Sequence, residues 1–168
     1  MLTAVKITTE LPTAQGRALL SRAAALAQAL VEILVHDKPV PFNIGFVLGV
    51  VPDGQDRFYQ HSGDRSLESL VELLEQAGAT AIVIVSASYI TVGPRGGDTK
   101  SDQPYLCLHL AEADGIHAVD YVAIVARKEG FTVGETITVN AANTVGLPYR
   151  APRLSRPTEE AVRRHRLH

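Results

Sequence analysis

Two apolar runs decide the fold: Ala81-Ile-Val-Ile-Val85 and Val119-Asp-Tyr-Val-Ala-Ile-Val125. Runs of this kind suit strands buried on both faces, as in a parallel sheet covered by helices. The segment between them opens with the cap-type residues Ser101-Asp102 and ends at Gly115, which predicts a helix. Residues 80–126 therefore predict a strand, a loop, a helix and a second strand. Such units usually carry function in the loop after the first strand.

A long helix precedes these runs. Pro12-Thr13 begins a helical pattern that extends to about Val35. The predicted inward face consists of Leu19, Ala23, Leu26, Leu30, Ile33 and Leu34. The opposite face is rich in alanine and carries few charges. Either the helix packs on both sides within its own domain, or it forms a subunit interface, in which case we expect a homo-oligomer through the helix 13–35.

The remaining elements are shorter. Strands from Phe42 to Val51 and from Arg57 to His61 are predicted to form a hairpin around the turn Pro52-Asp53-Gly54. A helix from Leu67 to Ala77 follows and ends at Gly78. Further strands are predicted over residues 2–9, 80–88, 118–126 and 131–139. One face of the last strand is expected to hold Phe131, Val133, Ile137 and Val139.

These elements predict a single three-layer α/β domain over residues 1–147, in which a mixed β-sheet is flanked by helices. An extended, basic C-terminal tail is predicted over residues 148–168, where Pro148, Pro152 and Pro157 interrupt the chain. A chain of 168 residues is long enough to bury a core. Its apolar runs are much shorter than the roughly 20 residues that cross a bilayer, so we expect no membrane contact.

The net charge of −2 hides an asymmetry between tail and body. From residue 149 onward there are six arginines and two glutamates, which give +4 and leave −6 for the rest. The arginines are Arg150, Arg153, Arg156, Arg163, Arg164 and Arg166. Such a tail can be a nucleic-acid arm, a solvated tail or a strap on its own acidic body. Because no aromatic residue is interleaved with the arginines, any nucleic-acid contact is expected to be weak.

The strongest candidate site is the Gly-rich loop 91–102. It is predicted to lie between a buried strand and a helix N-terminus, where free N–H groups and the helix dipole favour an anion. The candidate phosphate-binding residues are Gly93, Arg95, Gly96, Gly97, Thr99, Lys100 and Ser101. The loop fits neither the P-loop spacing nor the dinucleotide-binding glycine pattern. The alternative is a surface loop whose glycines and charges are only solvated.

Metal and hydrolase chemistry have little support. The four histidines of the body, His36, His61, His109 and His117, lack metal-ligand spacing, so we expect neither a metal nor another cofactor. Ser86 and Ser88 end a predicted strand but lack the frame of a nucleophile elbow.

Two single residues add detail. Cys107 is expected to be a small buried hydrophobe, and a single cysteine cannot form an internal disulfide, which fits the cytoplasm. Asp120 lies inside a predicted strand, where an acidic group must face solvent or a partner. It is therefore worth testing as a site residue.

Three segments carry a family resemblance: Gly78-Ala-Thr-Ala-Ile-Val-Ile84, Pro94-Arg-Gly-Gly-Asp-Thr-Lys-Ser-Asp102 and Gly115-Ile-His-Ala-Val-Asp-Tyr-Val-Ala-Ile124. In this order they resemble the GAxAIIL strand, the PSGDPxPSxxD stretch and the GIPLLDHIIIG strand of the JAB/MPN domain of RadC-like proteins. The zinc-binding HxHP of that family is replaced by Thr91-Val-Gly-Pro94, so both histidine ligands are missing. Only Asp102 could stand for the acidic ligand. The resemblance implies a metal-free relative kept for binding rather than hydrolysis.

The leading functional hypothesis is a non-catalytic α/β binding or assembly module. The alternative is a nucleotide- or phosphate-binding enzyme that uses the Gly-rich loop 91–102. A recognisable catalytic motif is missing from the sequence, which favours the first hypothesis.

Overall fold

Ten helices and strands make up the described part of the chain. The computed structural model describes residues 3–6, 12–33, 45–61, 66–92, 101–113, 115–128, 130–139, 144–147 and 152–155. In chain order the elements are β1 (Thr3–Lys6), α1 (Ala14–Glu32), β2 (Gly45–Val50), β3 (Asp56–Gln60), α2 (Leu67–Gln76), β4 (Ala81–Val92), β5 (Ser101–Glu112), β6 (Gly115–Arg127), β7 (Gly130–Val139) and β8 (Thr144–Leu147). Of the two described helices, neither is both long and apolar enough to span a bilayer.

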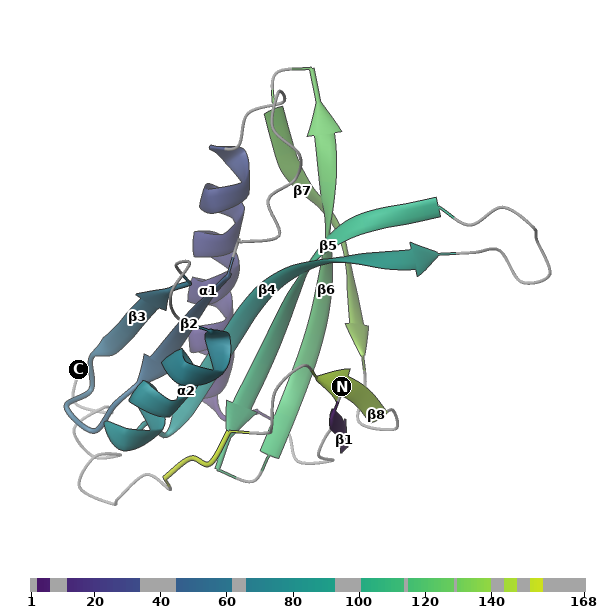
Figure 1. Ribbon diagram of the computed structural model, residues 1–168. Coiled ribbons are helices and arrows are strands. Elements are labelled where there is room, and N and C mark those ends of the chain that lie inside the picture. Colours follow the sequence, from purple (N-terminus) through teal and green to yellow (C-terminus); the bar gives the residue numbers. More distant parts are fainter. Residues whose placement is uncertain are drawn as a thin grey trace.

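Six strands form one open sheet in the order β3-β2-β4-β5-β6-β7, and every pairing in it is antiparallel. The short strands β1 and β8 form a separate antiparallel pair. Figure 1 shows β4 and β5 continuing together beyond the rest of the sheet as a two-stranded arm. The sheet and its helices confirm the expected combination of α and β elements. The expected parallel unit and mixed sheet are wrong.

The helix expected after the Gly-rich loop is instead the strand β5, which pairs with β4 along its whole length. The pattern of leucines explains the difference. Leu106 and Leu110 match helical spacing, but together with Leu108 they match the period of two of a strand face. Pro104 suits the first turn of a helix equally well. It is tolerated in β5 because it lies in the two-stranded arm, where β5 does not pair with β6.

Buried side chains form two clusters on opposite faces of the sheet, which we call the α1 face and the α2 face. Ala81, Val83 and Val85 of β4 pack in the cluster that contains α1. Ile82 and Ile84 alternate with them and pack in the cluster that contains α2. A central antiparallel strand covered on both faces therefore reads as a continuous apolar run, as a parallel strand would.

The helix α1 confirms the predicted long helix and part of its inward face, because Leu19 and Ala23 are buried and Leu30 packs against the same cluster. Leu34 lies outside the described residues. The buried residues of α1 are Gly16, Leu19, Ala23, Ala27 and Val31. Leu26 and Ile33, expected to point inward, are 40% and 73% exposed. The buried residues are mainly four positions apart, and three of the five are glycine or alanine. The larger side chains of Leu26 and Ile33 point away from the sheet.

Glu112 joins the start of α1 to the end of β5. Its carboxylate accepts hydrogen bonds from the backbone N–H of Thr13, at 3.0 Å, and from the Thr13 hydroxyl. The helix dipole favours an anion at this position. A Cβ on Gly16 would lie 2.8 Å from the carboxyl carbon of Glu112, so this close approach requires glycine.

A β-bulge changes which side chains of β7 face α1. Two residues of β7 stand opposite the single residue Ala123 of β6. In a regular strand, residues three positions apart point to opposite faces. The extra residue of the bulge places Val133 and Thr136, which are three positions apart, on the same α1 face. Phe131 and Val133 pack toward α1, whereas Ile137 is exposed on the opposite face. The expectation that Phe131, Val133, Ile137 and Val139 share one face is therefore wrong.

One short piece of the C-terminal tail contacts the body. The N–H of Ser155 donates to the carbonyl of Ala79 at 3.0 Å, and Leu154 packs against the α2-face cluster. Arg153, directly before Leu154, is exposed. The other tail arginines, Arg150, Arg156, Arg163, Arg164 and Arg166, lie outside the described residues.

Candidate functional site

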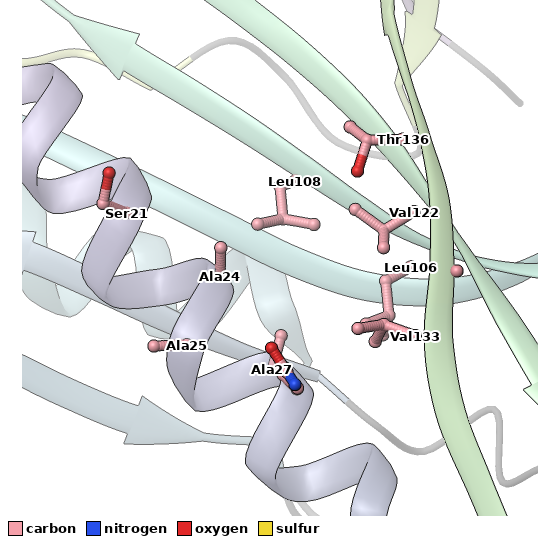
Figure 2. Close-up of a pocket in the computed structure, with 11 residues that line it drawn as sticks. Ser21, Ala24, Ala25, Ala27, Leu106, Leu108, Val122, Val133 and Thr136 are labelled. Carbon is pink, nitrogen blue, oxygen red and sulfur yellow. The ribbon is translucent and has the colours of Figure 1, made fainter.

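A groove of about 410 Å³ lies between α1 and the strands β5, β6 and β7, and we call it the α1 groove. Figure 2 shows the helix on one side and the strands on the other, with side chains from both directed into the space between them. The lining residues are Ser21, Ala24, Ala25, Ala27, Gln28, Leu106, Leu108, Val122, Val133, Gly134 and Thr136. Small-molecule sites in proteins typically have volumes of roughly 300–1,000 Å³.

The helix wall of the groove consists mainly of small side chains. Ser21, Ala24 and Ala27 are spaced by three residues, so they share one side of α1. None of them extends further than one atom beyond Cβ. The buried residues of α1 seat the helix on the sheet, and the short side chains next to them leave the space open. Gln28 supplies the one long polar side chain of this wall.

The sheet wall is apolar at its base and more polar at its rim. Leu106 and Leu108 of β5 are fully buried at the base. Val122 of β6 and Val133 of β7 are half-buried, and Thr136 is exposed at the rim. The wall thus offers an apolar surface that is partly open to water.

Gly134 holds the β-bulge that brings Val133 and Thr136 to the same wall. A Cβ at this position would lie 2.7 Å from Cγ2 of Val125 on the neighbouring strand. A larger residue would therefore push Val125 away or shift the bulge. The shape of this wall depends on that one glycine.

Asp120 lies at one end of the sheet wall. It pairs across the sheet with Leu108 on one side and with Thr138 on the other. Its Oδ1 accepts a hydrogen bond of 2.8 Å from the Thr138 hydroxyl. Residues paired across an antiparallel sheet point to the same face, so the carboxylate is on the α1 face beside a residue that lines the groove.

Cys107 and His109, the thiol and the imidazole of β5, point away from the groove. Cys107 and His109 alternate with the leucines that face α1, so they lie on the α2 face, and Tyr121 is paired with Cys107. Burial lowers the pKa of His109 from 6.5 to about 4, which leaves the imidazole neutral at pH 7. Burial and then the neighbouring Cys107 raise the pKa of Tyr121. Within the described ranges, no group of three or more histidine, cysteine or acidic residues is placed to hold a metal.

The predicted phosphate site falls largely outside the described residues. This holds for Gly93, Arg95, Gly96, Gly97, Thr99 and Lys100, whereas Ser101 is the first residue of β5. The flanking strands β4 and β5 are paired as far as Val92 and Ser101. The expected helix N-terminus is therefore replaced by the start of a strand, and the dipole argument for an anion no longer applies. The phosphate site itself stays a prediction.

The α1 groove was not predicted from the sequence. The alanine-rich side of α1 is equally compatible with close packing and with a subunit interface. Leu106 and Leu108 were expected on a helix, whereas they lie on β5 opposite α1. The run of small residues in α1 is the sequence feature that could have indicated the groove. Recognising it as a groove wall also requires the order of the strands.

Comparison with known proteins identified no relative of this chain. No family model, no curated protein and no solved structure matches the chain.

Proposed function

We propose that the protein is a non-catalytic binding module whose ligand is a small, largely apolar molecule held in the α1 groove. The observation that carries this proposal is a groove of about 410 Å³ with an apolar base and a few polar groups at its edge. Removing the apolar surfaces of groove and ligand from water stabilises the complex by roughly 25 cal/mol for each Å² buried. Ser21, Gln28 and Thr136 can orient the ligand by hydrogen bonds.

The placement of the reactive side chains supports binding rather than catalysis. Cys107 and His109 are on the α2 face, and the sheet separates them from the groove. A neutral histidine with a pKa of about 4 is also a weak base at pH 7. A molecule in the groove would contact alanines, leucines, valines and neutral polar groups.

The proposal can be tested with a neutral fluorescent probe, N-phenyl-1-naphthylamine, which brightens in apolar sites. We expect saturable binding to the wild type and a loss of about tenfold or more in Ala24→Trp, because the indole would fill the groove. Ala18→Trp is the matched control, since Ala18 is an exposed residue of the same helix that does not line the groove. Absence of saturable binding, or equal affinity in the two variants, would count against the proposal.

A second candidate function is self-assembly through α1, as a homo-oligomer. Leu26 and Ile33 on α1 and Phe58 on β3 are large apolar residues that are 40%, 73% and 44% exposed. Asp56, two residues before Phe58, forms an ion pair with Arg22 of α1, so this side of the helix is next to the edge strand. An apolar strip at a sheet edge suits a partner surface.

Sedimentation velocity tests the assembly candidate. We expect a dimer or larger species for the wild type and a shift toward monomer for Ile33→Glu, because burying a carboxylate in an interface is costly. Ala18→Glu adds the same charge at another exposed position of α1 and should have less effect. A monomeric wild type would exclude this candidate.

Other expectations from the sequence also remain proposals. They are the three-layer arrangement, a relationship to metal-free RadC-like proteins, a cytoplasmic location, weak nucleic-acid contact through the tail, and a phosphate-binding enzyme that uses the loop 91–102. Support for the last comes from Arg95 and Lys100, which could neutralise phosphate. Comparing ATP binding of the wild type and of the double variant Arg95→Ala, Lys100→Ala would test it.

A further inference from the structure

We infer that the α1 groove selects an amphipathic amine, with the ammonium group held by Asp120 and the apolar body in the groove. The inference rests on the proposed function, since it names the ligand class of the same site. It adds a charge preference that an apolar groove alone would not have.

The position of Asp120 is the first support. Leu108, its partner on β5, lines the groove, and so does Val122, two residues further along β6. Side chains at i and i+2 of a strand share a face and lie roughly 6.5–7 Å apart. Asp120 is therefore two residues from the lining residue Val122 along β6 and directly beside the lining residue Leu108 on β5.

The contacts of Asp120 are the second support. Its Oδ1 is held by the Thr138 hydroxyl at 2.8 Å. Among the described residues this hydrogen bond is the one interaction recorded for Asp120, and no cation lies within ion-pair distance of it. The hydrogen bond orients the carboxylate, while Oδ2 remains able to accept from a ligand.

The charge of the groove is the third support. All eleven residues that line it are uncharged. Asp120 is the acid paired with the lining residue Leu108, and the exposed Glu135 lies between the lining residues Gly134 and Thr136. Arg17, one turn before Ser21 in α1, is exposed and makes no ion pair with Asp120. An ammonium group would gain a charge-assisted hydrogen bond, whereas a carboxylate ligand would be repelled.

Three ligands with the same eight-carbon chain separate head-group preference from apolar binding: octylammonium, 1-octanol and octanoate. Displacement of N-phenyl-1-naphthylamine at pH 7 gives the affinity of each. We expect octylammonium to bind about tenfold more tightly than 1-octanol, and octanoate to bind most weakly.

The variant Asp120→Asn removes the charge and keeps an oxygen that can accept from Thr138. We expect it to bring the preference for octylammonium over 1-octanol close to one and to leave 1-octanol binding within about twofold. Glu68→Gln is the matched control, because Glu68 is an exposed carboxylate of α2, on the opposite face of the sheet. It should leave the preference unchanged. Raising the salt concentration in the wild type should also reduce the preference, which checks the charge effect without a variant.

Each outcome has a distinct meaning. Equal binding of the amine and the alcohol, or an amine preference that survives in folded Asp120→Asn, overturns the inference and leaves the proposed function intact. If none of the three ligands binds and the neutral probe also fails to bind, both are overturned. A preference that is lost in Asp120→Asn and falls with salt, but is retained in Glu68→Gln, supports the inference.

Discussion

The two helices cover the sheet in different ways. The short helix α2 buries Leu70, Val71 and Leu74 against β2 and β4, and Leu74 lies so close that a Cβ on Gly49 would be 2.9 Å from its Cδ1. The longer helix α1 touches more strands, but three of its five buried residues are glycine or alanine. The α2 contact is filled by large side chains, whereas the α1 contact is partly open.

This difference shows that the length of a helix does not determine how tightly it packs against a sheet. Branched and long apolar side chains at a contact leave little room, as in the interior of most proteins. Small side chains allow a close approach at one line and leave a groove beside it. Stability should therefore depend most on the α2 side, and ligand binding on the α1 side.

The largest expected effect comes from truncating the α2 contact. Leu74→Ala should lower the free energy of unfolding by about 2–5 kcal/mol, because a fully buried leucine is replaced and a cavity remains. Leu73, its half-buried neighbour, is the matched control, and Leu73→Ala should cost clearly less. Urea denaturation measures both. Similar losses for the two variants would contradict the comparison of the faces.

The next effect concerns His109 on the α2 face. Because its pKa is about 4 when folded and 6.5 in the unfolded chain, the unfolded state binds more protons between these pH values. Stability is therefore full above about pH 6.5 and falls as the pH approaches 4, by up to about 3 kcal/mol.

His109→Gln supplies the control for this pH dependence. The carboxylates titrate in both proteins, so the difference between their urea midpoints at pH 7 and pH 4.5 isolates the imidazole. The wild type should lose more stability on acidification than the variant. Parallel losses would show that His109 is protonated in the folded protein or is not buried.

A smaller effect is expected at the start of α1. Gly16→Ala normally stabilises a helix, but here the added Cβ would collide with the carboxyl group of Glu112. We expect a loss of about 1–3 kcal/mol. The double variant with Glu112→Ala should lose less than the sum of the two single variants, as a thermal or urea unfolding cycle would show. Strict additivity would mean that the two residues do not meet.

The smallest expected change tests the groove itself. Ala24→Leu should alter stability by no more than about 0.5 kcal/mol, because its side chain enters open space. Ala23→Leu, one residue earlier, should cost about 1–3 kcal/mol, because Ala23 is fully buried against the sheet. Equal costs in urea denaturation would mean that the groove is closed in solution.

The sequence predicted the parts of the fold that depend on local patterns. The start of the first helix at Pro12-Thr13, the end of the second at Gly78 and the turn at Pro52-Asp53-Gly54 follow local rules, and the elements beside them are where the patterns place them. Strand direction could not be derived in the same way. The continuous run of β4 reflects burial on both faces, and burial alone does not distinguish parallel from antiparallel pairing.

The candidate site depended on features that local patterns do not contain. Alternation along β7 fails at the bulge opposite Ala123, which no turn or spacing signal announces. Leu106 and Leu110 fit both a helix face and a strand face, and only the pairing with β4 decides between them. Asp120 was noticed as an acid inside a strand, but its relation to α1 required the strand order.

The contact between Thr13 and Glu112 has a consequence for the order of events on the ribosome. The end of α1 at Glu32 is made 80 residues before Glu112, counted as 112 − 32. At roughly 5–20 residues per second this delay is roughly 4–16 s. The α2 unit closes sooner, because Thr80 bonds to Val50 across only 30 residues. During synthesis the alanine-rich α1 segment is therefore complete for seconds before its acidic partner at the helix start exists.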